Sequence, residues 1–244
     1  SLPVFHDDQH GTAIITLSAL INSLKLVKKH LEKIKVVILG AGSAGYGITN
    51  ILASAGCKNI IVVDSTGAIY KGRRDLMNNP FKSEIASKSN PKQIEGSLDL
   101  VMKGSDVFIG VSGKGNILND KIVSSMNADP IIFALSNPDP EILPQDALDA
   151  GAKIVATGRS DFPNQVNNAV VFPSVIRSLL DLRVKVLDDH LMVDVAYAIA
   201  DLVECQHLKY DYIIPQINDQ RILPVVTQTL KNVIQNTATT NIIK

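Results

Sequence analysis

The chain has 244 residues, and its 24 basic and 24 acidic side chains leave no net charge. This balance excludes the electrostatic footprint of a nucleic-acid-binding or membrane-surface protein. No apolar run approaches the ~18 residues of a spanning helix, the N-terminus lacks signal-peptide features, and Cys57 and Cys205 form no disulfide framework. We therefore expect a soluble, cytoplasmic protein without a nucleic-acid or membrane partner.

The first segment, FHDDQHG at residues 5–11, is polar and carries the adjacent carboxylates Asp7 and Asp8. Such a pair can bind a hard divalent cation, but acids before a helix also act as caps, so both interpretations stay open. His6 and His10 have the spacing of the zinc motif H-E-x-x-H. A glycine follows directly and the helical pattern begins only afterwards, which makes a zinc hydrolase a minor alternative.

A long apolar helix is predicted next. Thr12 is a plausible N-cap, and apolar residues recur at helical spacing for about six turns, to residue 34. We expect this helix to pack against the domain that follows it.

Residues 36–64 combine an apolar run, a glycine-rich turn, an amphipathic segment and a second apolar run that ends in an acid. Gly40, Gly42 and Gly45 have the spacing G-x-G-x-x-G, and Asp64 lies nineteen residues after the last of them. This order predicts a βαβ unit whose helix N-terminus faces the phosphates of a dinucleotide.

The choice of dinucleotide is only partly readable. Asp64 can accept a hydrogen bond from a ribose 2′-hydroxyl and would repel a 2′-phosphate, which favours NAD. Lys71, Arg73 and Arg74 follow in a glycine-punctuated loop and could neutralise that phosphate, so NADP stays possible.

Strands and helices continue to alternate along the chain. Strands are predicted at 36–39, 60–63, 106–111, 131–135 and 154–156, and helices at 43–55, 121–126, 144–150, 174–182, 190–203 and 223–236, while 81–91 is read as helix or loop. This order predicts an α/β fold, a Rossmann-type doubly wound, mainly parallel sheet with helices on both faces. We expect a single domain, 1–244, made of a metal loop and linking helix (1–34), a Rossmann core (35–172) and closing helices (173–244).

Polar side chains follow the predicted strands at their carboxyl ends, where ligands bind in such sheets. Asn137 lies in the sequence SNP, and Asn167 and Asn168 lie in QVNN. Asparagine at a strand end is often a turn former, but an amide also suits a hydroxyl and a carboxylate of a ligand. Arg159 could bind an acidic ligand or form a surface salt bridge.

These segments together resemble a known family. PVFHDDQHGTAI, VVILGAGSAGYGI, VVDSTGAIYKGR, ALSNPDPE and ATGRSDFPNQVNNAVVFPS are similar to the C-terminal nucleotide-binding domain of malic enzymes of the short prokaryotic type, from Pro3 to about Val203. The resemblance implies oxidation of L-malate by NAD or NADP and decarboxylation to pyruvate, with Mg²⁺ or Mn²⁺.

The resemblance also implies roles for individual residues. Asp8 corresponds to a metal-ligating aspartate, Asp7 to its acidic neighbour in the catalytic site, and Asn137 and Asn168, with Asn167 beside them, to amides that hold malate. The implied cofactor contacts are Gly40, Gly42, Ser43, Ala44, Gly45, Asp64, Ser112 and Asn137.

The family has an N-terminal catalytic domain that supplies a tyrosine acid, a lysine base, a substrate arginine and a Glu-Asp pair of metal ligands. We expect that domain to be missing here, so that this chain alone binds dinucleotide without turning over malate. The family also suggests a homo-oligomer. A non-catalytic dinucleotide-binding module and a dehydrogenase for another 2-hydroxy acid remain alternatives.

Overall fold

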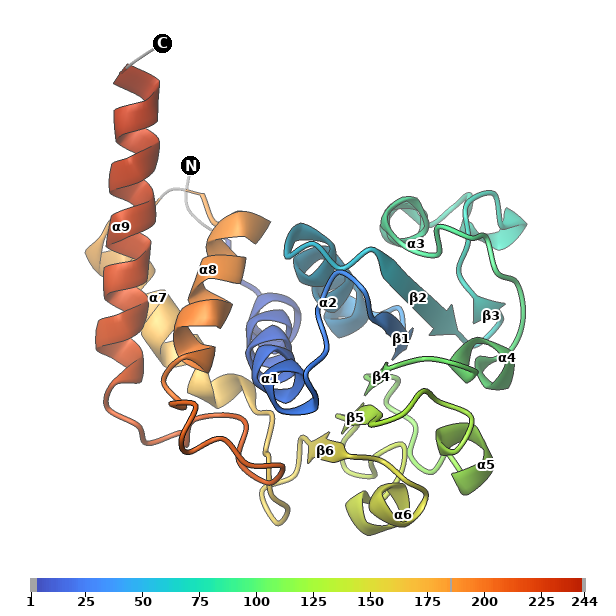
Figure 1. The fold of residues 1–244 in the computed structure, drawn as a ribbon. Coiled ribbons are helices and arrows are strands. Elements are labelled where there is room, and N and C mark those ends of the chain that lie inside the picture. The colour runs from blue at the N-terminus through green and yellow to red at the C-terminus, as the bar shows by residue number, and fades with distance from the viewer. Residues whose placement is uncertain (1–3, 185, 243–244) are drawn as a thin grey trace.

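A six-stranded sheet forms the centre of the computed structural model, which describes residues 4–184 and 186–242 (Figure 1). The strand order is β3-β2-β1-β4-β5-β6, and every pair is parallel except β2 with β3. The strands are β1 (Lys35–Leu39), β2 (Asn59–Asp64), β3 (Gly67–Ala68), β4 (Val107–Gly110), β5 (Ile131–Ala134) and β6 (Ile154–Thr157). β1 lies between β2 and β4, so the sheet changes winding direction there, which is where doubly wound sheets bind ligands.

Helices cover both faces of this sheet. The described helices are α1 (Thr12–Val27), α2 (Ser43–Ser54), α3 (Pro80–Lys88), α4 (Leu98–Met102), α5 (Asp120–Val123), α6 (Pro144–Asp149), α7 (Phe172–Asp181), α8 (Asp189–Ala200) and α9 (Ile222–Ile242), with short helical turns η1 (Asp7–Gly11), η2 (Arg74–Leu76) and η3 (Asn168–Val170). Side chains alternate along the strands, so Val36 and Ile38 pack with α1, α2 and α8, whereas Val37 and Leu39 pack with α4 to α6. The expected fold class is confirmed.

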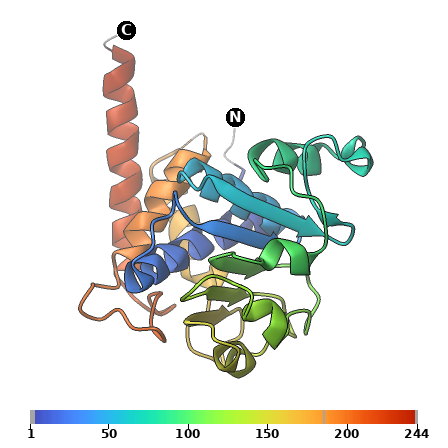
Figure 2. The same cartoon turned by 45° about the vertical axis from the view of Figure 1, so that its right-hand side comes forward.

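The three closing helices are also present. α7 packs against α9, and α8 packs against both α1 and α9. Figure 2 shows that α9 extends well beyond the body of the molecule at one end.

The linking helix differs from its prediction at both ends. A π-helical turn, η1, runs directly into α1, so Thr12 has helical dihedrals and is not the N-cap. α1 ends at Val27 rather than residue 34, because Lys28 adopts a left-handed conformation and its N–H closes the helix on the Leu24 carbonyl.

The stretch Asp7–Val27 is long and apolar enough to cross a membrane, since an 18-residue segment within it has a mean hydropathy of 1.2, which corrects the expectation that nothing in the chain reaches that length. However, 72% of that 18-residue segment is buried inside the fold. Every residue of α1 from Ala13 to Leu24 is buried, as in the core helix of a globular domain.

Candidate functional site

The glycine turn joins β1 to α2, and each glycine of the motif has a distinct structural reason. Gly40 has φ +115°, and an added Cβ would lie 2.6 Å from the Val111 carbonyl oxygen. At Gly45 a Cβ would lie 1.9 Å from the Gly40 oxygen, so only glycine lets α2 approach the turn this closely. A Cβ at Gly42 meets nothing within 4 Å, which leaves an open surface beside the start of α2.

The N-terminus of α2 is prepared for an anion. Its N-cap, Gly42, offers no side-chain oxygen, and the first turn from Ser43 contains no acid. The free N–H groups and the helix dipole therefore favour a phosphate at this position.

Asp64 ends β2, and its carboxylate lies inside a cluster of cations. Arg73 donates to both carboxylate oxygens, over 3.1 and 2.6 Å, and Lys82 Nζ lies 2.6 Å from Oδ2. Thr66 adds a backbone N–H over 2.9 Å, and the Asp64 side chain is only 6% exposed. Burial alone would raise the pKa of Asp64, but the hydrogen bonds from these cations outweigh it and hold the pKa well below its usual range.

This cluster changes the interpretation of the basic loop. Arg73, which the sequence suggested as a partner for a 2′-phosphate, is buried and bound to Asp64 and Asp75. Lys82 on α3 was not considered at all, because it lies eighteen residues beyond Asp64 and only the fold brings it back.

The depressed pKa of Asp64 has a consequence for stability. An unfolded aspartate has a pKa of about 3.9, so below about pH 4 the unfolded chain takes up the proton before the folded chain does. The contribution of Asp64 is thus complete above about pH 5 and is lost as the pH falls. In urea unfolding, we expect Asp64→Asn to lose less stability than the unaltered chain between about pH 5 and 3. Asp99→Asn, an exposed control, should lose stability with falling pH as steeply as the unaltered chain. If Asp64→Asn also lost stability as steeply as the unaltered chain, the expectation would be contradicted.

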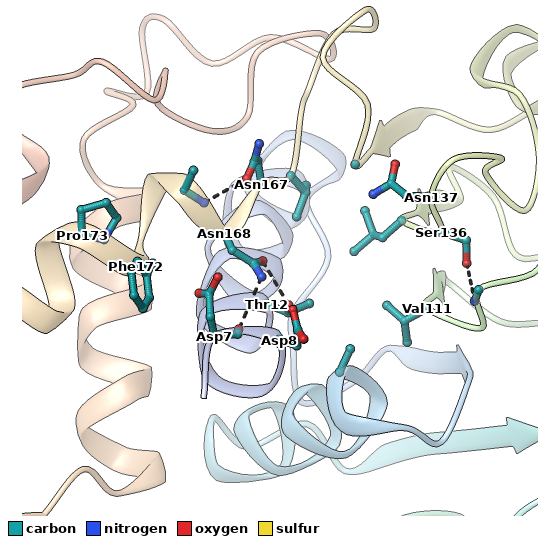
Figure 3. A pocket seen from close by; sticks show the side chains of 16 residues that line it. Asp7, Asp8, Thr12, Val111, Ser136, Asn137, Asn167, Asn168, Phe172 and Pro173 are labelled. Carbon is teal, nitrogen blue, oxygen red and sulfur yellow. Dashed lines mark hydrogen bonds between the residues drawn. The ribbon is translucent and has the colours of Figure 1, made fainter. Parts of the chain in front are cut away.

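A cavity of about 570 Å³ opens at the carboxyl ends of β4, β5 and β6, beside the start of α2 (Figure 3). It is lined by residues from segments far apart in the sequence: Asp7, Asp8, Thr12, Ala44, Val111, Gly113, Leu135, Ser136, Asn137, Gly158, Val166, Asn167, Asn168, Ala169, Phe172 and Pro173. The fold therefore brings together the acidic pair, the glycine-turn helix and the predicted amides.

The acidic pair lies on the π-helical turn at one wall of this cavity. Asp8 is exposed, whereas Asp7 is half-buried and its Oδ1 is buried without a hydrogen-bond partner. Burial raises the pKa of Asp7, against the neighbouring amide of Asn168, which lowers it. An unpartnered carboxylate oxygen beside a second carboxylate fits a hard cation such as Mg²⁺ or Mn²⁺.

The site in this part of the protein is nevertheless incomplete for a metal. Within residues 4–184 and 186–242, no group of three or more His, Cys, Asp or Glu side chains could hold an ion. The zinc alternative gains nothing either, because Nδ1 of His10 already accepts a hydrogen bond from the His6 N–H.

Asn168 fastens the acidic turn to the opposite segment. Its Oδ1 accepts from the Thr12 hydroxyl over 3.0 Å, and its Nδ2 donates to the Asp7 carbonyl over 3.4 Å (Figure 3). The amide thus contacts both the start of α1 and the backbone of the acidic pair. Thr12, which was predicted to cap the helix, instead donates its hydroxyl proton to Asn168.

The other predicted polar residues differ in their placement. Asn137 is exposed in the cavity wall, while the Asn167 side chain accepts from the Ala169 N–H and caps η3, as a turn former does. Arg159 forms an exposed salt bridge with Asp161 and does not line the cavity. Ser112 does not line the cavity, and its N–H and hydroxyl donate to Glu141.

A fourth glycine, Gly47, also has a structural role, although it lies outside the motif recognised in the sequence. A Cβ at Gly47 would lie 2.3 Å from the Gln9 carbonyl oxygen, so this glycine lets the acidic turn pack directly on α2. A glycine inside a helix, two residues after the motif, was a signal for such a close approach.

The fold and cavity define a Rossmann-type dinucleotide-binding domain with an acidic and amide-lined pocket beside the glycine turn. Residues 9–236 match the family model described as "Malic enzyme, NAD binding domain". The chain therefore belongs to the malic enzyme family, as its sequence motifs predicted.

Relatives in the family show how much of such a protein the chain represents. It is 47% identical over 242 residues to the bifunctional malic/malolactic enzyme of Bacillus subtilis, covering 99% of this chain and 58% of the relative. It is 46% identical over 229 residues to the NAD-dependent malic enzyme of Geobacillus stearothermophilus, covering 94% of this chain and 47% of the relative. The chain thus spans about half the length of these two relatives.

Solved structures agree with this assignment. The NAD-dependent malic enzyme from Thermotoga maritima superposes with a TM-score of 0.87 at 41% identity, over 94% of this chain and 59% of that one. The malic enzyme from Pyrococcus horikoshii superposes with a TM-score of 0.90 at 35% identity, over 96% of this chain and 56% of that one.

Proposed function

We propose that this chain is the cofactor-binding part of an NAD(P)-dependent malic enzyme, which oxidises L-malate and decarboxylates it to pyruvate with Mg²⁺ or Mn²⁺. The observation that carries the proposal is the cavity, which places Asp7, Asp8 and Asn168 beside the N-terminus of the glycine-turn helix. A dinucleotide bound at that helix has its reactive end within reach of groups suited to a metal and a hydroxy acid.

The residues around the cavity divide the work of binding. N–H groups at the start of α2 hold the pyrophosphate, and the amides of Asn137 and Asn168 bind the hydroxyl and a carboxylate of malate. Asp7 and Asp8 provide oxygen ligands for the divalent cation, which when bound supplies Lewis-acid stabilisation of the charge on the reacting oxygen. Two carboxylates make an incomplete cation site, so the remaining ligands and the proton-transfer groups come from the other part of the enzyme.

NAD is the proposed cofactor. The carboxylate of Asp64 lies at the end of β2, where the adenine-side ribose binds in such folds, and it repels a 2′-phosphate. The nearby cations Arg73 and Lys82 already pair with Asp64 and are not free for that phosphate. We also propose that the enzyme is cytoplasmic and that it forms a homo-oligomer.

The test separates binding from catalysis. We expect the unaltered chain to quench or shift NADH fluorescence on titration, and to produce no steady NADH from NAD, L-malate and Mn²⁺. Sustained malate-dependent NADH formation by this chain alone would overturn the assignment of catalytic groups to another part. Absence of NADH binding would overturn the proposal itself.

A further inference from the structure

Glu141 is a fully buried carboxylate bound to Ser136, which lines the cavity, and the chemistry proposed above does not use it. It follows the loop after β5, and the ion pairs found among the described residues do not include it. Burying a charged group is costly unless hydrogen bonds compensate it, so such a residue needs a reason.

Its hydrogen bonds join the loops that follow two neighbouring strands. Oε1 accepts from the N–H and the hydroxyl of Ser112 after β4, each over 3.3 Å, and from the hydroxyl of Ser136 after β5. Oε2 accepts from the Ser136 N–H over 3.2 Å. One side chain therefore holds both loops by their backbones.

The carboxylate also orients the Ser136 hydroxyl. Because that hydroxyl donates its only proton to Glu141, its lone pairs are free to accept, and the N–H of Gly113 donates to them over 2.9 Å. The chain of hydrogen bonds runs from Gly113 through Ser136 to Glu141. It ties the two loops together a second time.

An amide cannot replace this carboxylate. Each oxygen of Glu141 accepts from a backbone N–H, that of Ser112 on one side and that of Ser136 on the other. In either orientation of a glutamine, the NH₂ group would face one of these N–H donors. Gly110 packs directly on this carboxylate and leaves no room for a side chain, since a Cβ at Gly110 would lie 2.2 Å from the Glu141 carboxyl carbon.

The two loops lie on one side of the dinucleotide site. Gly113, Ser136 and Asn137 line the cavity that holds the acidic pair, on the β4 and β5 side of the glycine turn. Asp64, on the adenosine side, lies across β1 at the end of β2. The nicotinamide ring must lie on the cavity side, because that is where the proposed malate groups are.

We propose that Glu141 is a positioning residue that holds the Ser112–Gly113 and Ser136–Asn137 loops in the arrangement that receives the nicotinamide half of the cofactor. This inference rests on the proposed function and adds a residue to it. Glu141 acts through the loops and does not itself contact the cofactor.

The test compares NADH with ADP-ribose, which has the adenosine, pyrophosphate and second ribose but lacks nicotinamide. In calorimetric titrations of the whole chain, we expect Glu141→Gln to weaken NADH binding by about tenfold or more, because one loop N–H loses its acceptor and the other keeps only an uncharged one. The affinity for ADP-ribose should stay within about twofold, because the start of α2 is untouched.

Two further variants keep the test decisive. Ser136→Ala removes the middle of the hydrogen-bond chain and should show the same selective loss, and it replaces Glu141→Gln if that variant does not fold. Asp139→Asn, the same chemical change on an exposed residue of the same loop, should bind both ligands normally. In the double variant Ser136→Ala/Glu141→Gln, the losses should be less than additive.

Each remaining outcome contradicts the inference. Equal weakening of NADH and ADP-ribose would show a general structural role, and unchanged NADH binding would show that Glu141 does not position the loops. If the unaltered chain bound ADP-ribose but not NADH, the inference would fail while the phosphate site stood. If it bound neither, the proposed function would fail first.

Discussion

Replacing Asp8 with alanine is expected to abolish malate-dependent NADH formation in a completed enzyme. Such an enzyme can be made by fusing this chain to the part of the Bacillus subtilis relative that it does not match. Loss of a cation that acts as a Lewis acid costs several kcal/mol of barrier, so the rate should fall by about 10³-fold or more. The measurement is initial rate against Mn²⁺ concentration, with NADH binding recorded in parallel.

The control separates a metal ligand from a structural acid. Asp99→Ala removes an exposed carboxylate on α4, which covers the opposite face of the sheet from α2, and should leave the rate and the Mn²⁺ dependence unchanged. NADH binding should survive in Asp8→Ala, because the start of α2 is intact. If Asp8→Ala left the rate and the Mn²⁺ dependence of the completed enzyme unchanged, the result would favour the alternative in which the acidic turn only begins the helix α1.

Asp64→Asn is expected to shift the cofactor preference toward NADP. The change removes a carboxylate that pairs with both Arg73 and Lys82, and it leaves two cations near the end of β2. A 2′-phosphate then supplies the missing negative charge instead of being repelled by one. We expect the ratio of NADPH to NADH affinity to rise by about tenfold, equal to about 1.4 kcal/mol.

Asp75→Asn is the matched control for this prediction. Asp75 also binds Arg73, but its side chain is 47% exposed and it does not contact Lys82 among the described contacts. Its loss should change the affinity ratio little, because Asp64 still pairs with both cations. A ratio that stays the same in Asp64→Asn would show that this carboxylate does not discriminate between the cofactors.

The main lines of the fold could be predicted from the sequence because they depend on local rules. Strands buried on both faces are apolar throughout, and a strand-to-helix turn this tight accepts only glycine at positions such as Gly40 and Gly45. The alternation of these units predicted the parallel sheet, and the sheet in turn predicted that ligands bind at its carboxyl edge. Family membership followed from the combination of short motifs, each of which has little specificity alone.

The end of α1 and the fate of Thr12 could not be read in the same way. The apolar period continues past Val27, but Lys28 turns left-handed and its N–H bonds to Leu24, which ends the helix. The start of α1 could not be read either. The π-helical turn η1 that precedes it packs against α2, and this packing requires Gly47, a residue of α2. Both choices depend on packing between elements rather than on the local pattern.

The sequence by itself determined the dinucleotide turn, the class of fold and the family, because glycine spacing and strand periodicity are short-range properties. Only the tertiary structure decided what each charge near the site does. It paired Asp64 with Lys82, left Asp7 with a buried, unpartnered oxygen, and buried Glu141 between two loops. The physical reason is that the pairing and burial of a charge depend on neighbours that the chain brings together only when the sheet is assembled.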